Sequence, residues 1–563
     1  MEAAARGGTP ALSAQRKRLV LMAAVLGTTV VTIDSTVANV ALPSIADELG
    51  GGLAGQQWTA NAYLVTLSSL LLIGGSLGDI FGERRVFALG VLAFGATSVL
   101  CAVAPTIEVL VGARALQGIA GALLTPAALA VIVSAFPPDE RGKAVGAWTA
   151  WGGIGTVLGP VIGGQLVDSA SWRWIFAINV PIVLVTIVLI LRVVPAGRER
   201  DPEARVDVVG ALLCALGLAG VTFGLIEQPL NGWGDPLVAL PLVVGALMLA
   251  GFLVWESRAA HPMLPLTLFR RRNFAAGNLE TFLMYGGLGL LFFFLVLFLQ
   301  QVAGFSALEA GSSSIPVTVL MFGLSMRFGA LADKHGPRFF MGFGPLVAAA
   351  GMVLLVMRVD ADADYLSDVL PGLLVFGVGL SMTVAPLTST VLADADDSNA
   401  GIASGVNNAI ARVAGLVAIA AVGAVVAATF GSKLEDNVGE RALARPAVAR
   451  AVEKAKRQPL AVVEVQGVPE EAAASVRESA EDASVDAFHV GLGIATALVA
   501  LGGVLGLVGI ANPRRRVAAA DCPGGQLVGH PRDGARQSPC DWDEGIRPVA
   551  VSLSASAAGS GDD

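Results

Sequence analysis

Fourteen long apolar segments follow one another along this 563-residue chain, each about as long as a helix that crosses a lipid bilayer. Hydrophobic residues make up 54% of the chain and charged residues only 15%, and the mean hydropathy is +0.70. Lipid offers the backbone no hydrogen-bond partners, so such segments should be α-helices. The sequence therefore predicts an all-α membrane protein. The expected spans are 19–43, 57–78, 86–105, 108–132, 143–167, 174–195, 206–226, 236–256, 274–300, 307–330, 339–357, 366–390, 401–430 and 488–510.

Basic residues gather in alternate connections, as the positive-inside rule requires of cytoplasmic loops. No cleavable signal peptide is expected, because residues 16–18 (RKR) lead directly into the first span. The acidic connection near residues 394–397 is the exception. The pattern predicts a multi-pass protein with both termini in the cytoplasm. The excess of arginine over lysine, with abundant alanine, glycine and valine, favours a bacterial cell membrane. The inner basic residues are Arg84, Arg85, Arg141, Lys143, Arg192, Arg198, Arg200, Arg205, Arg258, Arg270, Arg271, Arg272, Arg327, Lys334 and Arg338.

The expected domains follow from these spans. They are a cytoplasmic N-terminus (1–18), a six-helix bundle (19–195), two linker helices (206–256), a second bundle (274–510) and a disordered cytoplasmic tail (511–563). Residues 433–487 are expected to form a long extracellular loop, either with short helices over the outer face or as a solvated spacer. Cys522, His530 and Cys540 match no zinc-binding pattern, so neither a metal nor a cofactor is expected.

A ten-residue pattern occurs twice, once after the second expected span and once after the tenth. Residues 75–85 read GSLGDIFGERR and residues 329–338 read GALADKHGPR, so both fit GxLxDxxGxR. Two matches at corresponding places indicate a duplicated unit. Since they are eight spans apart, we expect two six-helix halves with spans 7 and 8 inserted between them.

The repeated pattern also predicts a gate. Glycine permits a tight turn, and an aspartate at a helix end can bind an arginine or the N-terminus of a neighbouring helix. Such a contact can hold the cytoplasmic side closed in one state and break in the other. A plain positively charged loop is the alternative. The expected gating residues are Gly75, Asp79, Gly82, Arg84, Asp333 and Arg338.

The fifth expected span contains four glycines and a proline in ten residues, GTVLGPVIGG at 155–164. Proline removes a hydrogen-bond donor from the helix, and the glycines let another helix approach closely. A packing groove with no further role is the alternative. The residues of interest are Gly155, Gly159, Pro160, Gly163 and Gly164.

Taken in order, these motifs resemble the 14-span drug:proton antiporter branch of the major facilitator superfamily, a family of multidrug exporters. Residues 155–164 are similar to its fifth-span antiporter signature, 33–43 (IDSTVANVALP) to its first-span signature and 114–118 (RALQG) to its fourth-span motif. Further matches lie at 172–181 and 401–408. The resemblance implies a major facilitator fold, with two pseudo-symmetric six-helix bundles plus two inserted helices. It also implies export in exchange for protons.

Asp34 and Arg114 are expected at similar depth in the outer half of the membrane. A rise of about 1.5 Å per residue places Asp34 roughly 22 Å beyond Leu19, and Arg114 about 9 Å from the outer end of its span. A charge at bilayer depth costs at least about 2.5 kcal/mol, so each is a functional candidate. A pair whose proton affinity changes as helices move would couple transport to protons. A static buried ion pair between spans 1 and 4 is the alternative.

Glu280 and Arg412 are the counterparts in the second half. Glu280, about 9 Å from the cytoplasmic side, is expected to bind protons or a cationic substrate, or else to reach the membrane surface without a role. Arg412 lies nearer the middle of its span. Glu227, at the end of span 7, is expected to be solvated.

Aromatic and amide side chains suggest where a substrate would bind, because aromatic faces attract apolar cations. The alternative for those in spans 2 and 4 is packing between the two helices. The four phenylalanines at 292, 293, 294 and 298 are expected to contact lipid or other helices. The expected substrate contacts are Trp58, Asn61, Tyr63, Gln117, Asn407 and Arg412.

Proton-driven export of small amphipathic drugs or antibiotics is the predicted function. A proton-coupled uptake symporter is the alternative, and a membrane receptor that docks partners through residues 433–487 is a third. ATP-driven transport is not expected, because no GxxxxGK[ST] loop occurs, and no Ser/His/Asp constellation suggests an enzyme. The expected partners are a small-molecule substrate, protons and the lipid bilayer, not nucleic acid, and the protein is expected to be a monomer.

Overall fold

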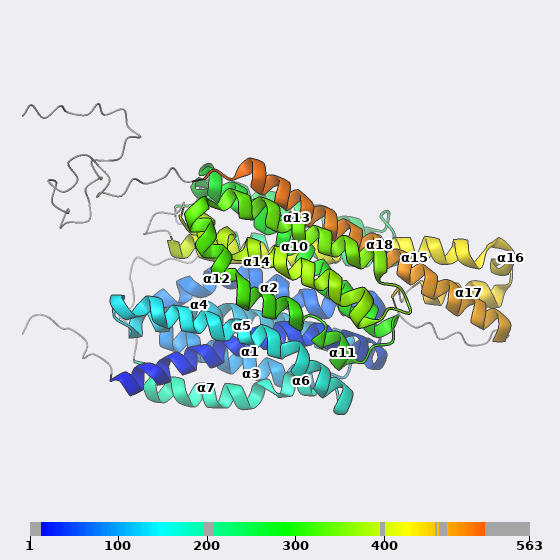
Figure 1. The fold of residues 1–563 in the computed structure, drawn as a ribbon. Coiled ribbons are helices and arrows are strands. Elements are labelled where there is room, and N and C mark those ends of the chain that lie inside the picture. The colour runs from blue at the N-terminus through cyan, green and yellow to red at the C-terminus, as the bar shows by residue number, and fades with distance from the viewer. Residues whose placement is uncertain are drawn as a thin grey trace, which may run out of the picture. The chain divides into compact units, whose positions relative to one another are not determined.

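The structure, a computed structural model, describes residues 13–195, 207–260, 262–393, 400–456, 459–460 and 470–512. Within these ranges every regular element is a helix, which confirms the predicted all-α class (Figure 1). The chain separates into two units, residues 1–511 and 512–563, and all the helices belong to the first. The expected tail, and with it Cys522, His530 and Cys540, lies outside the described residues from residue 513 onward.

The first half of the helical unit begins near the N-terminus and ends at residue 195. Its helices are α1 (Ala14–Leu49), α2 (Gly52–Phe81), α3 (Glu83–Ala102), α4 (Ile107–Ala135), α5 (Pro138–Ser169), α6 (Trp174–Ala177) and α7 (Asn179–Val193). Two further helices follow, α8 (Val208–Asn231) and α9 (Pro236–Glu256).

The second half starts with a short 3₁₀ helix. Its elements are η1 (Leu266–Arg270), α10 (Arg272–Gln301), α11 (Ala307–Ser312), α12 (Ile315–His335), α13 (Pro337–Arg358), a π-helical turn η2 (Tyr365–Val369), α14 (Leu370–Ala393), α15 (Ala400–Val438), α16 (Glu440–Leu443), α17 (Pro446–Ala455) and α18 (Glu470–Gly509). We refer to the end of the bundle where α1 ends and α2 begins as the predicted outer end.

Twelve stretches of helix in the described residues are long and apolar enough to cross a membrane. The helices α2 and α5, of 30 and 32 residues, pack among them. This arrangement is compatible with the predicted fourteen spans. Several helix starts follow from local sequence: Asp207 caps α8 by accepting from the Gly210 N–H at 2.8 Å, and Ser306 and Glu309 form a capping box on α11.

Glycines let the helices within each half touch backbone to backbone. A Cβ on Gly90 of α3 would lie 2.9 Å from the Leu124 nitrogen of α4, and one on Gly287 of α10 would lie 2.9 Å from the Ala495 oxygen of α18. Both distances are too short for any side chain. Small residues take this role in membranes because lipid gives helices no hydrophobic reason to associate, so close fit must hold them together.

The helices α8 and α9 form the inserted pair that the sequence predicts. They pack on each other through Gly220 and Gly245, whose backbones approach closely. The helix α8 also touches both halves, since Leu218 shares one apolar cluster with Val65 of α2 and Leu416 of α15. The inserted pair therefore lies against the seam between the halves and does not stand apart from them.

The repeated pattern adopts the same local structure in both halves. Gly82 ends α2 with φ of 92° and Gly336 ends α12 with φ of 91°, a region that favours glycine. The arginine two residues later then donates to a backbone carbonyl near the end of a packed helix. Arg84 Nη2 bonds the Leu191 oxygen at 2.6 Å, and Arg338 Nε bonds the Leu507 oxygen at 2.5 Å. This equivalence supports the predicted pseudo-symmetry.

In its described residues the segment at 433–487 contains the short helices α16 and α17, one of the two expected arrangements, together with extensions of α15 and α18 that were not expected. The helix α15 continues to Val438, and α18 already begins at Glu470, 18 residues before the expected start of its span at 488. At about 1.5 Å per residue, each of these helices is roughly 60 Å long, twice the thickness of a bilayer core. Figure 1 shows α16 and α17 beyond the ends of the other helices. The sequence interpretation missed the apolar residues that continue at helical spacing beyond the apolar spans of α15 and α18.

The apolar core runs without a break into this extension. Leu434, Val452 and Val476 belong to the same buried cluster as Phe298 and Phe488, whose rings stack at 4.2 Å within the bundle. Lys456 ties the extension together through an ion pair with Glu435 and another with Glu453 at 2.8 Å. Partial burial lowers the pKa of Lys456, but these two bonds raise it on balance. The extension is therefore a packed part of the helical unit.

Candidate functional site

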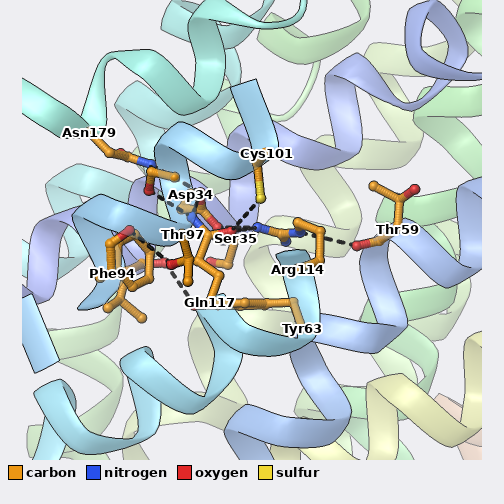
Figure 2. A network of polar contacts seen from close by, with 12 residues as sticks. Asp34, Ser35, Thr59, Tyr63, Phe94, Thr97, Cys101, Arg114, Gln117 and Asn179 are labelled. Atoms are coloured by element: carbon orange, nitrogen blue, oxygen red, sulfur yellow. Dashed lines mark hydrogen bonds and ion pairs between the residues drawn. The ribbon is translucent and has the colours of Figure 1, made fainter. Parts of the chain in front are cut away.

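Asp34 of α1 and Arg114 of α4 form an ion pair deep inside the first half (Figure 2). Each side chain is only 1% exposed. The depths estimated from the sequence placed the two residues near each other, and the structure brings them into direct contact. The pair is the centre of a network to which five helices contribute.

Two amide side chains complete the coordination of the Asp34 carboxylate. Gln117 Nε2 donates to Asp34 Oδ1 at 2.9 Å, and Asn179 Nδ2 donates to the same oxygen at 3.1 Å. Both amides also reach Ser98 Oγ of α3, at 2.9 Å and 3.3 Å. Gln117, expected to contact substrate, is instead fully buried in this network.

Arg114 has several partners besides Asp34. Its Nε donates to the Thr59 carbonyl of α2 at 3.1 Å, and its Nη1 donates to Gln117 Oε1 at 2.7 Å. The guanidinium also lies over the Tyr63 ring, 4.4 Å from its centroid, and 5.6 Å from the centroid of Phe176. Tyr63, another expected substrate contact, therefore presents a ring face to Arg114.

The network explains how an ion pair is tolerated where water is scarce. Taking two charges out of water costs several kcal/mol for each ion, and only good geometry with additional hydrogen bonds offsets that cost. Both carboxylate oxygens of Asp34 are occupied by donors. In this conformation the side chains of the pair are in direct contact. Protonation of Asp34 would require Arg114 to withdraw.

The sequence interpretation did not identify Ser98, Asn179 or the Thr59 carbonyl as part of the site. Ser98 and Asn179 are polar residues inside apolar spans, and each is 0% exposed. Polar residues at bilayer depth are candidates for this reason, so the signal was present. The backbone carbonyl has no signal in sequence, because its availability depends on how α2 and α4 pack.

The glycine-rich run of α5 packs against α1. A Cβ on Gly155 would lie 3.4 Å from Thr29 Cγ2, and one on Gly163 would lie 3.1 Å from Val37 Cγ1. At Gly159 a Cβ would overlap Thr36 Oγ1 and lie 3.4 Å from the Ile33 carbonyl, one residue before Asp34. The run therefore brings α5 against the segment of α1 that carries the carboxylate.

The opposite side of the same run contacts the second half. A Cβ on Gly164 would lie 2.6 Å from the Ala307 carbonyl of α11, and one on Gly311 would lie 2.6 Å from the Pro160 carbonyl. Asp168, four residues beyond Gly164, accepts the Ala307 N–H at 3.1 Å and the Leu308 N–H at 2.8 Å. A carboxylate at the start of a helix is favourable because the unpaired N–H groups there carry partial positive charge.

Other hydrogen bonds between the halves lie at the same end. Gln300 Nε2 of α10 donates to the Val40 carbonyl of α1 at 3.0 Å. Gln57 Nε2 of α2 donates to the Ile419 carbonyl of α15 at 2.7 Å. Val40 lies near the end of α1 and Gln57 near the start of α2, so these bonds join the halves at the predicted outer end.

The second half holds a carboxylate with a different environment. Glu280 of α10 is 0% exposed, and neither of its carboxylate oxygens has a hydrogen-bond partner among the described residues. It faces α18, where a Cβ on Gly502 would lie 3.9 Å from Glu280 Cγ. Nearby, Asn407 Nδ2 of α15 donates to Asn278 Oδ1 at 3.1 Å and to Thr281 Oγ1 at 2.8 Å.

The remaining expected substrate contacts lie near the seam between α2, α8 and α15. Trp58 Nε1 donates to Glu227 Oε1 of α8 at 3.2 Å, and its ring lies 5.6 Å from that of Phe223. Glu227, expected to be solvated, is therefore a hydrogen-bond acceptor in the seam. Asn61 is 0% exposed, and neither its Nδ2 nor its Oδ1 has a partner. Arg412 is half-buried on α15.

The expected gating residues lie away from the Asp34 network. Gly75 lies near α4, where a Cβ on Gly75 would be 3.8 Å from Pro126 Cβ. The side chain of Asp79 lies outside the described part of the structure. Its repeat partner Asp333 is exposed at the end of α12. Of the four phenylalanines of α10, three are fully buried in packing contacts.

Comparison with known proteins places this architecture in a family. A sequence profile of the Major Facilitator Superfamily matches residues 24–419. The chain belongs to this superfamily. The puromycin resistance protein pur8 of Streptomyces alboniger is 36% identical over 422 residues, which covers 74% of this chain and 83% of that protein. The tetracenomycin C resistance and export protein of Streptomyces glaucescens is 34% identical over 447 residues, covering 77% and 81%.

Solved structures agree on the fold. A bacterial homologue of the human lysosomal transporter Spinster superposes with a TM-score of 0.61 at 18% identity, covering 89% of this chain and 100% of that one. A D-xylose–proton symporter superposes with a TM-score of 0.56 at 15% identity, covering 88% and 98%. The predicted membership and the predicted major facilitator fold are confirmed.

Close packing at Gly159 generates the first prediction. Gly159→Leu would force the new side chain into Thr36 and the backbone of α1, so we expect a loss of about 1–3 kcal/mol of stability. The matched control is Gly112→Leu, because no atom lies within 4 Å of a Cβ built there. Thermal unfolding of both purified variants in detergent measures the difference. An equal Tm for the two would show that α1 and α5 can separate without cost.

The ion pair between Asp34 and Arg114 generates the second prediction. Asp34→Asn leaves the buried Arg114 charge without its counter-ion, which typically destabilises a protein by about 3–5 kcal/mol. Arg114→Gln should do likewise, whereas the double variant removes both charges and should recover most of the loss. A double-mutant cycle on Tm isolates the coupling between the two residues. Additive effects would contradict a direct interaction.

Proposed function

We propose that this protein is a proton-driven exporter of small amphipathic compounds such as antibiotics. The observation that carries the proposal is the buried Asp34–Arg114 pair in a chain whose relatives include resistance and export proteins. A carboxylate inside the membrane is costly, and here it sits between α1 and a helix, α5, that also packs on the second half. Movement between the halves can therefore reach the site.

The network has the spare hydrogen bonds that a proton-binding cycle needs. When Asp34 takes up a proton, Arg114 still has the Thr59 carbonyl, Gln117 Oε1 and the Tyr63 ring as partners. The amides of Gln117 and Asn179 still have Ser98 Oγ. These remaining partners offset part of the cost of leaving the buried Arg114 charge without its counter-ion.

Glu280 is proposed as a second proton carrier. An ionised carboxylate without a partner is unfavourable in a low-dielectric interior, so Glu280 is proposed to hold a proton in this conformation. Asp34, with its counter-ion, is proposed to be ionised. The two halves would then hold carboxylates in opposite protonation states, which is the arrangement expected partway through a cycle.

The contacts at the predicted outer end support a conformation closed toward the outside. Asp168 binds the start of α11, Gln300 binds α1, and Gln57 binds α15, and each bond joins the two halves. Export by alternating access requires these bonds to break when the protein opens outward. The duplicated motif with Asp79, Asp333, Arg84 and Arg338 is proposed to form the gate on the cytoplasmic side.

The proposed arrangement in the cell follows from the same features. The protein is a multi-pass membrane protein. We propose that it lies in a bacterial cell membrane as a monomer, with both termini in the cytoplasm and with bundles at 19–195 and 274–510 separated by the linker helices at 206–256. Its transport reaction needs no enzymatic step.

Proton coupling is tested by Asp34→Asn in proteoliposomes that contain a pH-sensitive dye. The variant keeps the shape of the side chain but cannot titrate, so uphill export and the accompanying proton movement should fall to background. Exchange of labelled for unlabelled substrate needs no proton and should persist, which separates lost coupling from lost folding. The matched control is Asp360→Asn, an exposed acidic residue. Normal coupled export by Asp34→Asn would reject the role.

The outer contact is tested by Asp168→Ala. Removing the carboxylate takes away both hydrogen bonds to α11, so the outward-open population should rise severalfold, as expected for a loss of about 1–2 kcal/mol. The separation of the halves is measured by pulsed electron paramagnetic resonance. Spin labels are attached at Ala170 and Asp362 in a variant whose native cysteines are replaced by serine. Glu108→Ala, at the outer end of α4, is the control. An unchanged distance distribution would contradict a gating role for Asp168.

A further inference from the structure

A stripe of polar residues lies on the face of α2 that packs against α15. Gln57, Asn61 and Ser68 are spaced at four and seven residues, so they share one side of the helix. Gln57 marks that side, because its Nε2 bonds the Ile419 carbonyl of α15. Asn61 has two unpaired amide atoms and Ser68 an unpaired Oγ, although both residues are buried.

Arg412 is the residue of α15 that faces this stripe. It lies four residues before Leu416, which shares an apolar cluster with Val65 of α2, and seven before Ile419, so the three point the same way. Arg412 also lies close enough to Tyr63 for an electrostatic interaction between them. From the bond between Gln57 and Ile419, the helix rise places Arg412 within about 4.5 Å of the level of Asn61.

No hydrogen bond or ion pair joins Arg412 to any described residue, whereas Arg114 has several such partners. An unpaired guanidinium away from bulk water is costly, and an unpaired buried amide adds about 1–3 kcal/mol. Arg412 remains partly exposed, so a bound molecule can reach it. Among the described residues, the seam thus holds an unpaired cation on α15 and unpaired amide and hydroxyl groups on the facing helix α2.

The aromatic rings of the seam that would attract a cationic compound are already engaged. The Tyr63 ring lies beneath Arg114, and Trp58 is bonded to Glu227 and packed on Phe223. Glu280 faces α18, where a Cβ on Gly502 would lie 3.9 Å from Glu280 Cγ. This differs from the expectation, based on aromatic content, that the site attracts apolar cations.

We infer that the exported compound is an acidic amphipath, whose carboxylate, phenolate or enolate group binds Arg412 while a neighbouring polar group binds Asn61. The inference rests on the proposed export function and specifies the chemistry of its substrate. A charged hydrogen bond between guanidinium and an anion is strong and directional. The apolar part of the compound would lie along the seam beside Val65 and Leu416.

Three pyrene compounds with one apolar frame test the inference by fluorescence binding to the purified protein in nanodiscs. They are pyrenebutyrate, its methyl ester and a pyrenebutyl trimethylammonium salt. The wild type should bind the acid about tenfold more tightly than the ester, as one charged hydrogen bond predicts. It should bind the ammonium salt least.

The variants assign the preference to one residue. Arg412→Gln should bind the acid about tenfold more weakly and the ester unchanged, and Arg412→Lys should retain part of the preference. Arg450→Gln, which removes an exposed arginine of α17, should bind as the wild type does. The Tm of each variant shows that it is folded, and unchanged ester binding shows that the seam is intact.

Two sets of results would overturn the inference. One is a wild type that binds the acid no better than the ester, or prefers the ammonium salt, including the case in which none of the three binds. The other is a preference for acid that persists in Arg412→Gln. Transport into everted vesicles, where export appears as accumulation, distinguishes a failure of this inference from a failure of the proposed function. Proton-driven export of cationic compounds alone would reject the acidic substrate and leave the exporter, whereas export indifferent to the proton gradient would reject the exporter.

Discussion

Direct contact between helix backbones is the constraint on which the rest of this structure depends. Helices in lipid are not driven together by the hydrophobic effect, so they associate where their surfaces fit. Gly118 of α4 lies against the Tyr63 carbonyl of α2, and this contact is the reason that Arg114, one turn away, can reach the Thr59 carbonyl and the Tyr63 ring. A bulkier residue at 118 would move the guanidinium away from both.

The same constraint connects the site to the movement of the halves. The glycines of α5 bring it against α1 beside Asp34, and the opposite side of α5 lies on α11 of the second half. A rotation of one half against the other would thus change the contact of α5 with α11, and a shift of α5 within its own half would carry that change to the contact with α1. The structure offers a short physical route from the seam to the carboxylate, through packed backbone and not through a flexible loop.

Much of this could be read from the sequence, and the features that could not be read share a cause. The spans, the repeat, the inserted pair and the meeting of Asp34 with Arg114 follow from hydropathy, spacing and helix rise, which are local or nearly so. The roles of Gln117 and Tyr63 depend on which side of each helix faces which neighbour. A span that is apolar all round does not show how its helix is rotated about its axis. The outer extension was missed for a related reason. Its helices become polar where they leave the expected span, although Val452 and Val476 still bury an apolar face.

The two halves, although built on one repeat, use their buried polar residues differently. In the first half the carboxylate, the guanidinium and both amides satisfy one another, so the network is rigid in this conformation. In the second half Glu280 and Arg412 have no hydrogen-bond or ion-pair partner among the described residues, and the buried amide of Asn61 on α2 is likewise unpaired. Unsatisfied buried groups raise the free energy of a protein unless another state or another molecule pairs with them. Satisfied and unsatisfied sites suit the different tasks that we propose for them. In the proposed cycle a proton on Asp34 releases Arg114 from a satisfied network, whereas a proton completes Glu280 and a bound anion completes Arg412, which are both unpaired in this conformation.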